Sequence, residues 1–481
     1  MVSDRMVIAR NTTLLVSAEV VTRALGALLT ILIARRLGAE KLGLLAFALS
    51  FTELFGFITR FGFRTMIARD LAKHPERTGP VLGGLLVLET LLGAAVLAAV
   101  WITLLLMGTG PEKSAVVLIC AGILVFSSIL DIFYAIYRAH QNAVHEVFNK
   151  IGLNLSVSIT GVAVIWMGYG LLPMLAVRLA LYAVFFAAGI RILVRRYSQP
   201  VFTGQTAFYA GLFRSALPFA ALGIIVTVNT QIGTILLTFF KGESETGYFS
   251  AALRICGVLT FLPMAFTSAV LPAMAKFRES GDDASFRLSY EKSLKFLFIL
   301  VIPIAVSFSV LAGPIIRLLY GSSFGQSVPM LRILLWMLVF AFLNQAFMIA
   351  FSAMDRESIF VRFQAFGTAF NVVLGLLLIP ATGGIGLCAA SAGSQALITL
   401  LSAGALTSRI PGVHPVRILA KAMICAGILG AALLPFRHQS PAVLLPAYGL
   451  AYVSMLFAIR TFGKGEIRMF RELLSRRGNT A

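Results

Sequence analysis

Charged side chains are scarce in this chain: only 12% of its 481 residues are Asp, Glu, Lys or Arg, whereas 59% are hydrophobic. A soluble domain carries about 25% charged residues, so this scarcity excludes an ordinary soluble protein. Alternating segments of about 10 residues, which mark a transmembrane β-barrel, are also missing. Apolar runs of about 20 residues, the length of a membrane-spanning helix, recur along the chain instead. The sequence therefore predicts an all-α integral membrane protein.

Several kinds of functional site are missing as well. The four cysteines lie in apolar runs without paired spacing, and the five histidines have no acid or cysteine at ligand spacing, so we expect no metal site. No Gly-rich loop ends in Gly-Lys-Ser/Thr, which excludes the usual ATP-binding loop. The first apolar run is too long for a cleavable signal peptide. We expect no cofactor and no catalytic residue, and therefore a protein that is not an enzyme.

Apolar runs between charged residues or Pro/Gly breaks predict fourteen transmembrane helices. The predicted spans are 11–35, 40–61, 80–107, 114–138, 146–168, 171–192, 211–240, 246–275, 292–319, 327–353, 358–380, 384–408, 415–435 and 441–460.

Lys and Arg are unevenly distributed between the predicted loops. With the N-terminus inside, most of them fall in cytoplasmic segments, and the positive-inside rule then places both termini in the cytoplasm of a multi-pass inner (cytoplasmic) membrane protein. The formal net charge of +20 reflects this bias and attraction to anionic membrane lipids, with no nucleic-acid partner. The tail from Gly463 predicts a short basic amphipathic helix on that leaflet. The opposite loops hold Arg35, Arg36, Lys41, Lys113, Lys241 and Arg437.

A weak internal repeat divides the chain. GAEKLGLLAFA from Gly38 and GESETGYFSAA from Gly242 both place glycines five apart, with acid between, at an offset of 204 residues. Two later turns recur at an offset of 214. The repeat predicts two six-helix lobes, residues 1–200 and 201–410, around a central cavity. Residues 411–481 would add two transmembrane helices and a basic cytoplasmic tail.

The first span carries two charges near its middle. Glu19 and Arg23 are four residues apart, so they lie on one helical face and can pair. Each charge is costly at the membrane centre, by about 2.5 to 3.5 kcal/mol on an insertion scale for Arg or Asp. One interpretation is a buried ion pair that only fixes packing, in which removing either charge alone costs stability. The other is a wet cavity in which Arg23 meets an anion.

Helices 211–240 and 246–275 supply matching polar groups. Arg254 lies on the second, and the repeat makes it a neighbour of the same cavity as Arg23. The first carries hydroxyls and amides at a similar depth, which suit a sugar, although such groups also join helices in membranes. They are Thr227, Asn229, Thr230, Gln231 and Thr234.

Three stretches resemble a known family: NTTLLVSAEVVTRALGALLTILIARRLGAEKLGLLAFALSF, GYFSAALRICGVLTFLPMAFTSAVLPAMAKF and LAGPIIRLLYGSSFGQSVPMLRILLWMLVF. They resemble the polysaccharide-export, O-antigen-type oligosaccharide flippases of the multidrug/oligosaccharidyl-lipid/polysaccharide exporter superfamily, over roughly residues 10–410. The resemblance implies alternating access, in which oligosaccharide on a polyprenyl pyrophosphate moves from the inner to the outer leaflet. The oligosaccharide moved in this way would serve cell-surface polysaccharide biosynthesis.

The resemblance also implies site residues and partners. Related lipid II flippases use cavity arginines on helices 1, 2 and 8, and Arg23 and Arg254 match the first and last by position. Arg60 is the candidate on helix 2, at the cytoplasmic mouth. Glu19 would hold Arg23 when the site is empty, or carry a coupling proton. H⁺ and Na⁺ are the candidate coupling ions, and polysaccharide assembly enzymes are candidate associates.

Two alternatives stay open. A cation-coupled multidrug exporter of the same superfamily would use a dominant acid and aromatics in its cavity. A membrane glycosyltransferase or polymerase would carry catalytic acids on a large outer loop, whereas the predicted outer loops are short.

Overall fold

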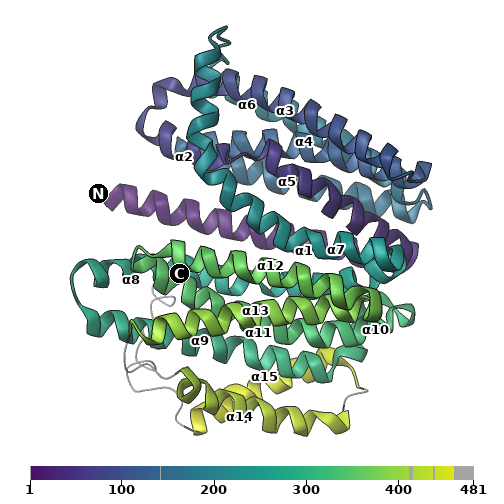
Figure 1. Ribbon diagram of the computed structural model, residues 1–481, viewed down its shortest axis with the longest axis vertical. Helices are drawn as coiled ribbons and strands as arrows, with labels where there is room; N and C mark the ends of the chain where they lie inside the picture. Colours follow the sequence, from purple (N-terminus) through teal and green to yellow (C-terminus); the bar gives the residue numbers. More distant parts are fainter. Residues whose placement is uncertain (1, 141, 411–414, 437–438, 460–481) are drawn as a thin grey trace, which may run out of the picture. The chain divides into compact units, whose positions relative to one another are not determined.

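The computed structural model describes residues 2–140, 142–410, 415–436 and 439–459. Within these ranges the regular elements are helices, without a strand (Figure 1). The predicted amphipathic tail from Gly463 lies outside the described residues. The α-helices are α1 (Val2–Thr59), α2 (Phe63–Lys73), α3 (Thr78–Leu106), α4 (Pro111–Ala139), α5 (Ala143–Trp166), α6 (Leu171–Arg196), α7 (Thr206–Leu259), α8 (Phe261–Glu279), α9 (Asp283–Val310), α10 (Ala312–Tyr320), α11 (Ser327–Ala353), α12 (Glu357–Thr382), α13 (Gly384–Thr407), α14 (Pro415–Leu433) and α15 (Pro441–Ala458).

Twelve helices in the described part of the chain are long and apolar enough to cross a membrane. The sequence predicts fourteen, and the difference arises at α1 and α7. In α1, two predicted spans form one helical segment that is interrupted only at a glycine. In α7, span 211–240 continues through such a glycine into the first part of span 246–275, and the rest of that span lies in α8. The prediction of an all-α membrane protein with about fourteen spans is confirmed.

The two interrupting glycines have the same backbone conformation. Gly38 in α1 has φ 81° and ψ −179°, and Gly242 in α7 has φ 83° and ψ −178°. Both values lie in a region that only glycine adopts without strain. The repeat seen in the sequence at an offset of 204 residues therefore coincides with a repeated turn.

The second glycine of each motif lets α1 and α7 cross at backbone contact. A Cβ atom at Gly43 would overlap the carbonyl oxygen of Glu243, and a Cβ at Gly247 would overlap the carbonyl oxygen of Ala39. The two contacts are reciprocal, because Gly43 and Ala39 correspond to Gly247 and Glu243 at the same offset. We call Ala39, Gly43, Glu243 and Gly247 the glycine crossing. Close approach of helices at small residues is typical of membrane proteins, in which dispersion contacts replace the hydrophobic effect.

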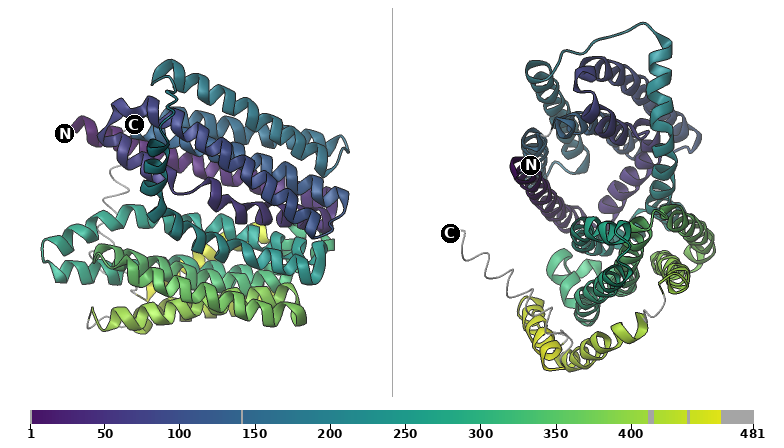
Figure 2. Two further views of the ribbon diagram at one scale, coloured as in Figure 1. Left: turned by 45° about the horizontal axis from the view of Figure 1, so that its top comes forward. Right: turned by 90° about the vertical axis from the view of Figure 1, so that its left-hand side faces the viewer.

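Residues 1–258 and 368–390 form one compact unit. In it, α1 packs on α3, α4 and α5, and α6 packs on α4 and α5; the purple-to-blue helices of Figure 2 show this bundle from two sides. The segment that joins α6 to α7 is tied to the start of α3. The Val201 N–H donates to the Gly79 carbonyl at 3.0 Å, and a Cβ at Gly83 would overlap the Val201 carbonyl. The segment between α6 and α7 therefore packs directly on the start of α3.

Residues 259–367 and 391–481 form the second compact unit. In its described part, α9 lies against α8, α11, α14 and α15. Asp282 caps the start of α9 and accepts a hydrogen bond from the Ser285 N–H at 3.0 Å, which lowers the pKa of Asp282. Within the bundle, Asn344 donates to the Gln395 side chain at 2.8 Å, so this amide pair is satisfied inside an apolar core.

The contact units divide the chain at different places from the predicted lobes. The first unit takes in α7 up to Val258, together with the end of α12 and the start of α13. The reason is local: α7 is joined to α1 by the glycine crossing, and Glu245 accepts a hydrogen bond from the Gly384 N–H at 2.9 Å. The six-helix lobes with limits at 200 and 410, and the addition 411–481, stay predictions.

Candidate anion-binding site

Three side chains of the first unit meet between α1 and α5, and Arg254 of α7 lies beside them. Glu19 Oε1 accepts from Arg23 Nε at 2.9 Å, and Glu19 Oε2 accepts from Lys150 Nζ at 2.8 Å. The predicted pairing of Glu19 with Arg23 is therefore confirmed. Arg23 Nη1 also donates to the Gly257 carbonyl of α7 at 3.2 Å. We call Glu19, Arg23, Lys150 and Arg254 the Glu19 cluster.

Arg254 reaches the cluster through a gap on α1. An ideal Cβ at Gly26 would lie 2.5 Å from Arg254 Nη2, so the guanidinium occupies the place of that missing side chain. Gly26 is three residues after Arg23, which puts both on one helical face. The structure thus brings Arg23 and Arg254 to neighbouring places. That both line one cavity stays a prediction.

The glycine crossing sets this meeting point. Arg23 precedes Gly38 by 15 residues, and Gly257 follows Gly242 by 15. Gly26 and Arg254 are each 12 residues from their respective turns. At about 1.5 Å per residue, these partners lie roughly 18 to 22 Å along their helices from the turns. Equal spacing from a shared crossing therefore aligns the arginines.

The cluster is only half-buried. The exposed fractions of the side chains are 30% for Glu19, 32% for Arg23 and 29% for Lys150. The interpretation of Glu19 and Arg23 as a buried ion pair would require almost no exposed surface. These exposed fractions do not fit a fully buried pair. The side chains of Arg23 and Lys150 therefore keep part of their surface uncovered by the rest of the described chain.

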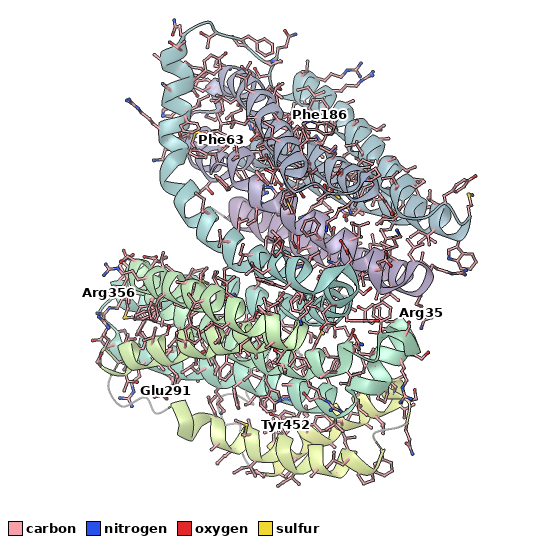
Figure 3. The ribbon with its side chains drawn as sticks, turned by 45° about the vertical axis from the view of Figure 1, so that its right-hand side comes forward. Arg35, Phe63, Phe186, Glu291, Arg356 and Tyr452 are labelled. Atoms are coloured by element: carbon pink, nitrogen blue, oxygen red, sulfur yellow. The ribbon has the colours of Figure 1, made fainter. Side chains whose placement is uncertain are left out.

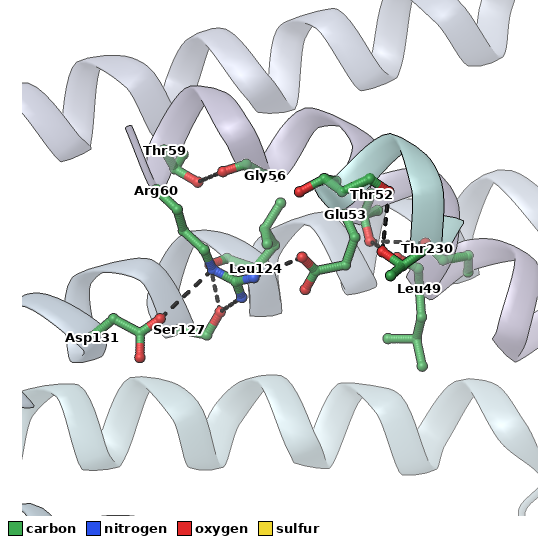
Figure 4. A network of polar contacts seen from close by, with 12 residues as sticks. Leu49, Thr52, Glu53, Gly56, Thr59, Arg60, Leu124, Ser127, Asp131 and Thr230 are labelled. Carbon is green, nitrogen blue, oxygen red and sulfur yellow. Dashed lines mark hydrogen bonds and ion pairs between the residues drawn. The ribbon is translucent and has the colours of Figure 1, made fainter. Parts of the chain in front are cut away.

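Arg60 belongs to a different cluster, at the end of α1 (Figure 4). Its Nη1 donates to Glu53 at 2.6 Å, its Nη2 donates to Ser127 of α4 at 3.2 Å, and its Nε lies 3.6 Å from Asp131. Nearby, Glu89 of α3 is 1% exposed and accepts from Ser128 at 3.0 Å. Three acidic residues, Glu53, Asp131 and Glu89, therefore lie around Arg60.

The polar band lies on the arm of α7 before Gly242. Thr227, Asn229 and Gln231 are half-buried, and the hydroxyl of Thr230 donates to the Thr227 carbonyl at 3.1 Å. Gln231 precedes Gly242 by 11 residues, close to the spacing of Arg254 on the other arm. The band and the arginine thus lie at similar distances along α7 from its turn, and a sugar-binding role for the band stays a prediction.

The second unit contains an apolar cavity of about 490 Å³ between α9 and α15. Tyr452, labelled in Figure 3, lies on its α15 side and stacks near Tyr448, with ring centroids 6.4 Å apart. The lining is almost wholly hydrocarbon. The lining residues are Phe296, Ile299, Leu300, Pro303, Ile304, Ser307, Phe308, Leu445, Tyr448, Gly449, Tyr452, Val453, Leu456 and Phe457.

Metal ligands are not assembled in the part of the chain that the structure describes, since no three His, Cys, Asp or Glu side chains are grouped there to hold an ion. The four cysteines are all buried and unpaired in disulfides. The chemistry of the site thus rests on cations, carboxylates and amides.

Comparison with known proteins places the chain in a family. The model of the family described as polysaccharide biosynthesis protein matches residues 8–278, more than half of the chain. The chain belongs to this family. The matched stretch contains all four residues of the Glu19 cluster and both glycine motifs.

Curated relatives and solved structures agree with this assignment. The probable flippase AglR of Haloferax volcanii is 28% identical over 213 residues, 44% of each protein. The lipid II flippase MurJ of Bacillus subtilis is 24% identical over 37% of this chain and 36% of its own. The chain thus matches less than half the length of these relatives. A lipid II flippase MurJ structure, in an inward closed conformation, has a TM-score of 0.75 at 16% identity and covers 96% of this chain and 99% of its own.

A second solved structure with a similar fold is that of a multidrug transporter. An inward-facing multidrug resistance MATE transporter of the MOP superfamily has a TM-score of 0.68 at 15% identity, over 82% of this chain and 96% of its own. At such identities these likenesses show the fold alone. The protein is a multi-pass helical membrane protein with the fold of this superfamily, as the sequence predicts.

Proposed function

We propose that this protein is a flippase that moves oligosaccharide linked to polyprenyl pyrophosphate from the inner to the outer leaflet of the cytoplasmic membrane. The Glu19 cluster carries the proposal, because three cationic side chains meet there on membrane-spanning helices. A pyrophosphate that leaves the aqueous interface needs charge-assisted donors. Arg23 and Arg254 offer planar guanidinium forks that suit phosphate oxygens. Transport by alternating access would serve cell-surface polysaccharide biosynthesis without changing the covalent structure of its substrate.

Other parts of the chain suit the remaining parts of this substrate. The polar side chains Thr227, Asn229 and Gln231 would contact the glycan, and Arg60 would act near the mouth of the path. The names of AglR and the lipid II flippase MurJ, both flippases, support the assignment.

A transport assay tests the proposal directly. The purified full chain in liposomes would be given a fluorescent polyprenyl pyrophosphoryl disaccharide, and a membrane-impermeant quencher would report its exposure on the far leaflet. We expect flipping by the wild type and its loss in Arg254→Ala at normal membrane abundance. Equal flipping by Arg254→Ala and the wild type would contradict the anion-site assignment.

The orientation and energy source are part of the same proposal. Both termini would be cytoplasmic, and an H⁺ or Na⁺ gradient would drive the cycle. A reporter fused at Ala481 and a cysteine probe at Lys241, which is exposed beside the Gly242 turn, would report opposite sides. Imposed pH or Na⁺ gradients across the same liposomes would identify the ion.

A cation-coupled multidrug exporter is the second candidate. The acids around Arg60, together with buried Glu89, favour it, because an exporter of cations needs exchangeable carboxylates. Efflux of a fluorescent cationic dye from the same liposomes would support it, especially if Asp131→Asn abolished dye efflux and left lipid flipping intact.

A further inference from the structure

Lys150 is the member of the Glu19 cluster that the sequence does not reveal. It lies near the start of α5, and its Nζ is 2.8 Å from Glu19 Oε2 on α1. The helix around it is well anchored. Asn149 accepts from the Tyr134 hydroxyl at 2.8 Å, and Asn154 donates to the Lys150 carbonyl at 2.8 Å. The ammonium group is thus held at the cluster by a fixed backbone.

Glu19 has the contacts that a phosphate group would have. Each of its two oxygens accepts from a different cation, at 2.9 Å from Arg23 and 2.8 Å from Lys150. These are distances of charge-assisted hydrogen bonds. A phosphate offers oxygens in the same relation, with more negative charge and more acceptor positions. Of the four side chains of the cluster, three are cationic and one is anionic.

From this geometry we infer that Lys150 is a third phosphate ligand, and that Glu19 is an internal anion that occupies Arg23 and Lys150 until a pyrophosphate displaces it. The inference rests on the proposed function. It adds Lys150 to the proposed phosphate ligands, and it adds a competition between Glu19 and the pyrophosphate for the same cations. Glu19 keeps the cations paired inside the membrane when no substrate is bound. Since Glu19 competes with the substrate, it also lowers the affinity of the site and so favours release.

A purely structural role makes the opposite prediction for Glu19. If Lys150 only neutralises Glu19, then Glu19 orients Arg23 for the substrate, and Glu19→Gln weakens anion binding. If Glu19 competes with the anion, Glu19→Gln removes the competing carboxylate from Arg23 and Lys150, and anion binding tightens. The two roles also make different predictions for Lys150 in the Glu19→Gln variant. A lysine that only neutralises Glu19 would then contribute nothing to anion binding, whereas a phosphate ligand would still contribute.

The experiment measures binding of inorganic pyrophosphate and of farnesyl pyrophosphate to the purified full chain in detergent. The variants are Glu19→Gln, Lys150→Met, Lys150→Arg and the double variant Glu19→Gln with Lys150→Met. Lys41→Met is the matched control, because Lys41 forms a similar pair with Glu112, 2.6 Å apart, outside the cluster. The double variant leaves no unpaired carboxylate, so it keeps the test valid if Lys150→Met alone folds poorly.

We expect Glu19→Gln to bind pyrophosphate several-fold more tightly than the wild type. The double variant should bind about tenfold more weakly than Glu19→Gln alone, the loss expected for one charge-assisted hydrogen bond. Lys150→Arg and Lys41→Met should bind like the wild type. Equal binding by Glu19→Gln and the double variant would overturn the role of Lys150, and weaker binding by Glu19→Gln would overturn the competition. If the wild type bound neither probe, the proposed function itself would fail.

Discussion

The glycine crossing and the Glu19 cluster lie on the same helices, α1 and α7, yet the helices approach each other very differently at the two places. At the crossing, one added methyl group at Gly43 or Gly247 would overlap backbone atoms. At the cluster, α1 reaches α7 through the long side chain of Arg23, which donates to the Gly257 carbonyl and keeps 32% of its surface exposed. The tight contact fixes the register of the two helices. At the cluster the helices are joined through long side chains, where the proposed function places the pyrophosphate.

The largest expected effect comes from adding a side chain at the crossing. Gly247→Val would force the Ala39 carbonyl away, and backbone cannot yield as a flexible side chain does. We expect a loss of about 3 kcal/mol or more, at the upper end of overpacking costs, seen as a lower melting temperature of the purified protein and a lower membrane level. Gly404→Ala in α13 is the control, since no other atoms lie within 4 Å of an added Cβ there, and it should be neutral or slightly stabilising. Normal stability of Gly247→Val would mean that the helices do not cross so closely.

The second effect concerns function at the cluster. Arg23→Gln should abolish flipping, because the pyrophosphate loses a donor, while the melting temperature changes little. The reason is that Glu19 keeps Lys150 as a partner. This alters the expectation drawn from the sequence, in which either charge left alone would be uncompensated. Flipping that survives Arg23→Gln at the wild-type rate would contradict a substrate role for Arg23.

A smaller effect is expected at Gly26, where the contact is with a movable group. Gly26→Ala would displace Arg254 Nη2, which lies 2.5 Å from the added Cβ, and the long side chain can move aside. We expect near-normal stability and a several-fold loss of flipping, measured in the same liposomes. Gly404→Ala is again the comparison, since no other atoms lie within 4 Å of its Cβ position and it lies outside the cluster. Equal flipping by the two variants would show that the position of Arg254 over Gly26 does not matter.

Local patterns in the sequence predict the features that depend on one helix. The spacing of Glu19 and Arg23 predicts their pairing, and the duplicated glycine motif predicts two equivalent turns at Gly38 and Gly242. The apolar runs predict the spans, although continuous helices at α1 and α7 reduce the observed number. These features follow from helical periodicity and from the special conformations of glycine, which the sequence displays directly.

Contacts between distant segments could not be predicted in this way. Lys150 lies 131 residues from Glu19, in a run that the sequence presents only as the cytoplasmic end of a span. Its approach to Glu19 depends on how far α5 slides along α1, and side-chain packing decides that. Likewise, the Arg60 cluster joins α1 to α4 through Asp131, so an arginine that the sequence places at the cytoplasmic end of span 40–61 becomes a member of an acidic network. No signal within either helix identifies these partners.

The smallest expected effect tests whether charge helps to hold the crossing closed. Lys113 of α4 donates to Glu243 at 2.7 Å, directly beside the backbone contact of Gly43, and both side chains are partly exposed. Exposed ion pairs contribute about 0 to 1 kcal/mol, so Lys113→Met should lower the melting temperature by at most a few degrees and leave flipping intact. High salt should reduce the difference between Lys113→Met and the wild type, because screening weakens the pair. A loss as large as that of Gly247→Val would mean that the ion pair, and not the absence of side chains at the glycines, keeps α1 and α7 together.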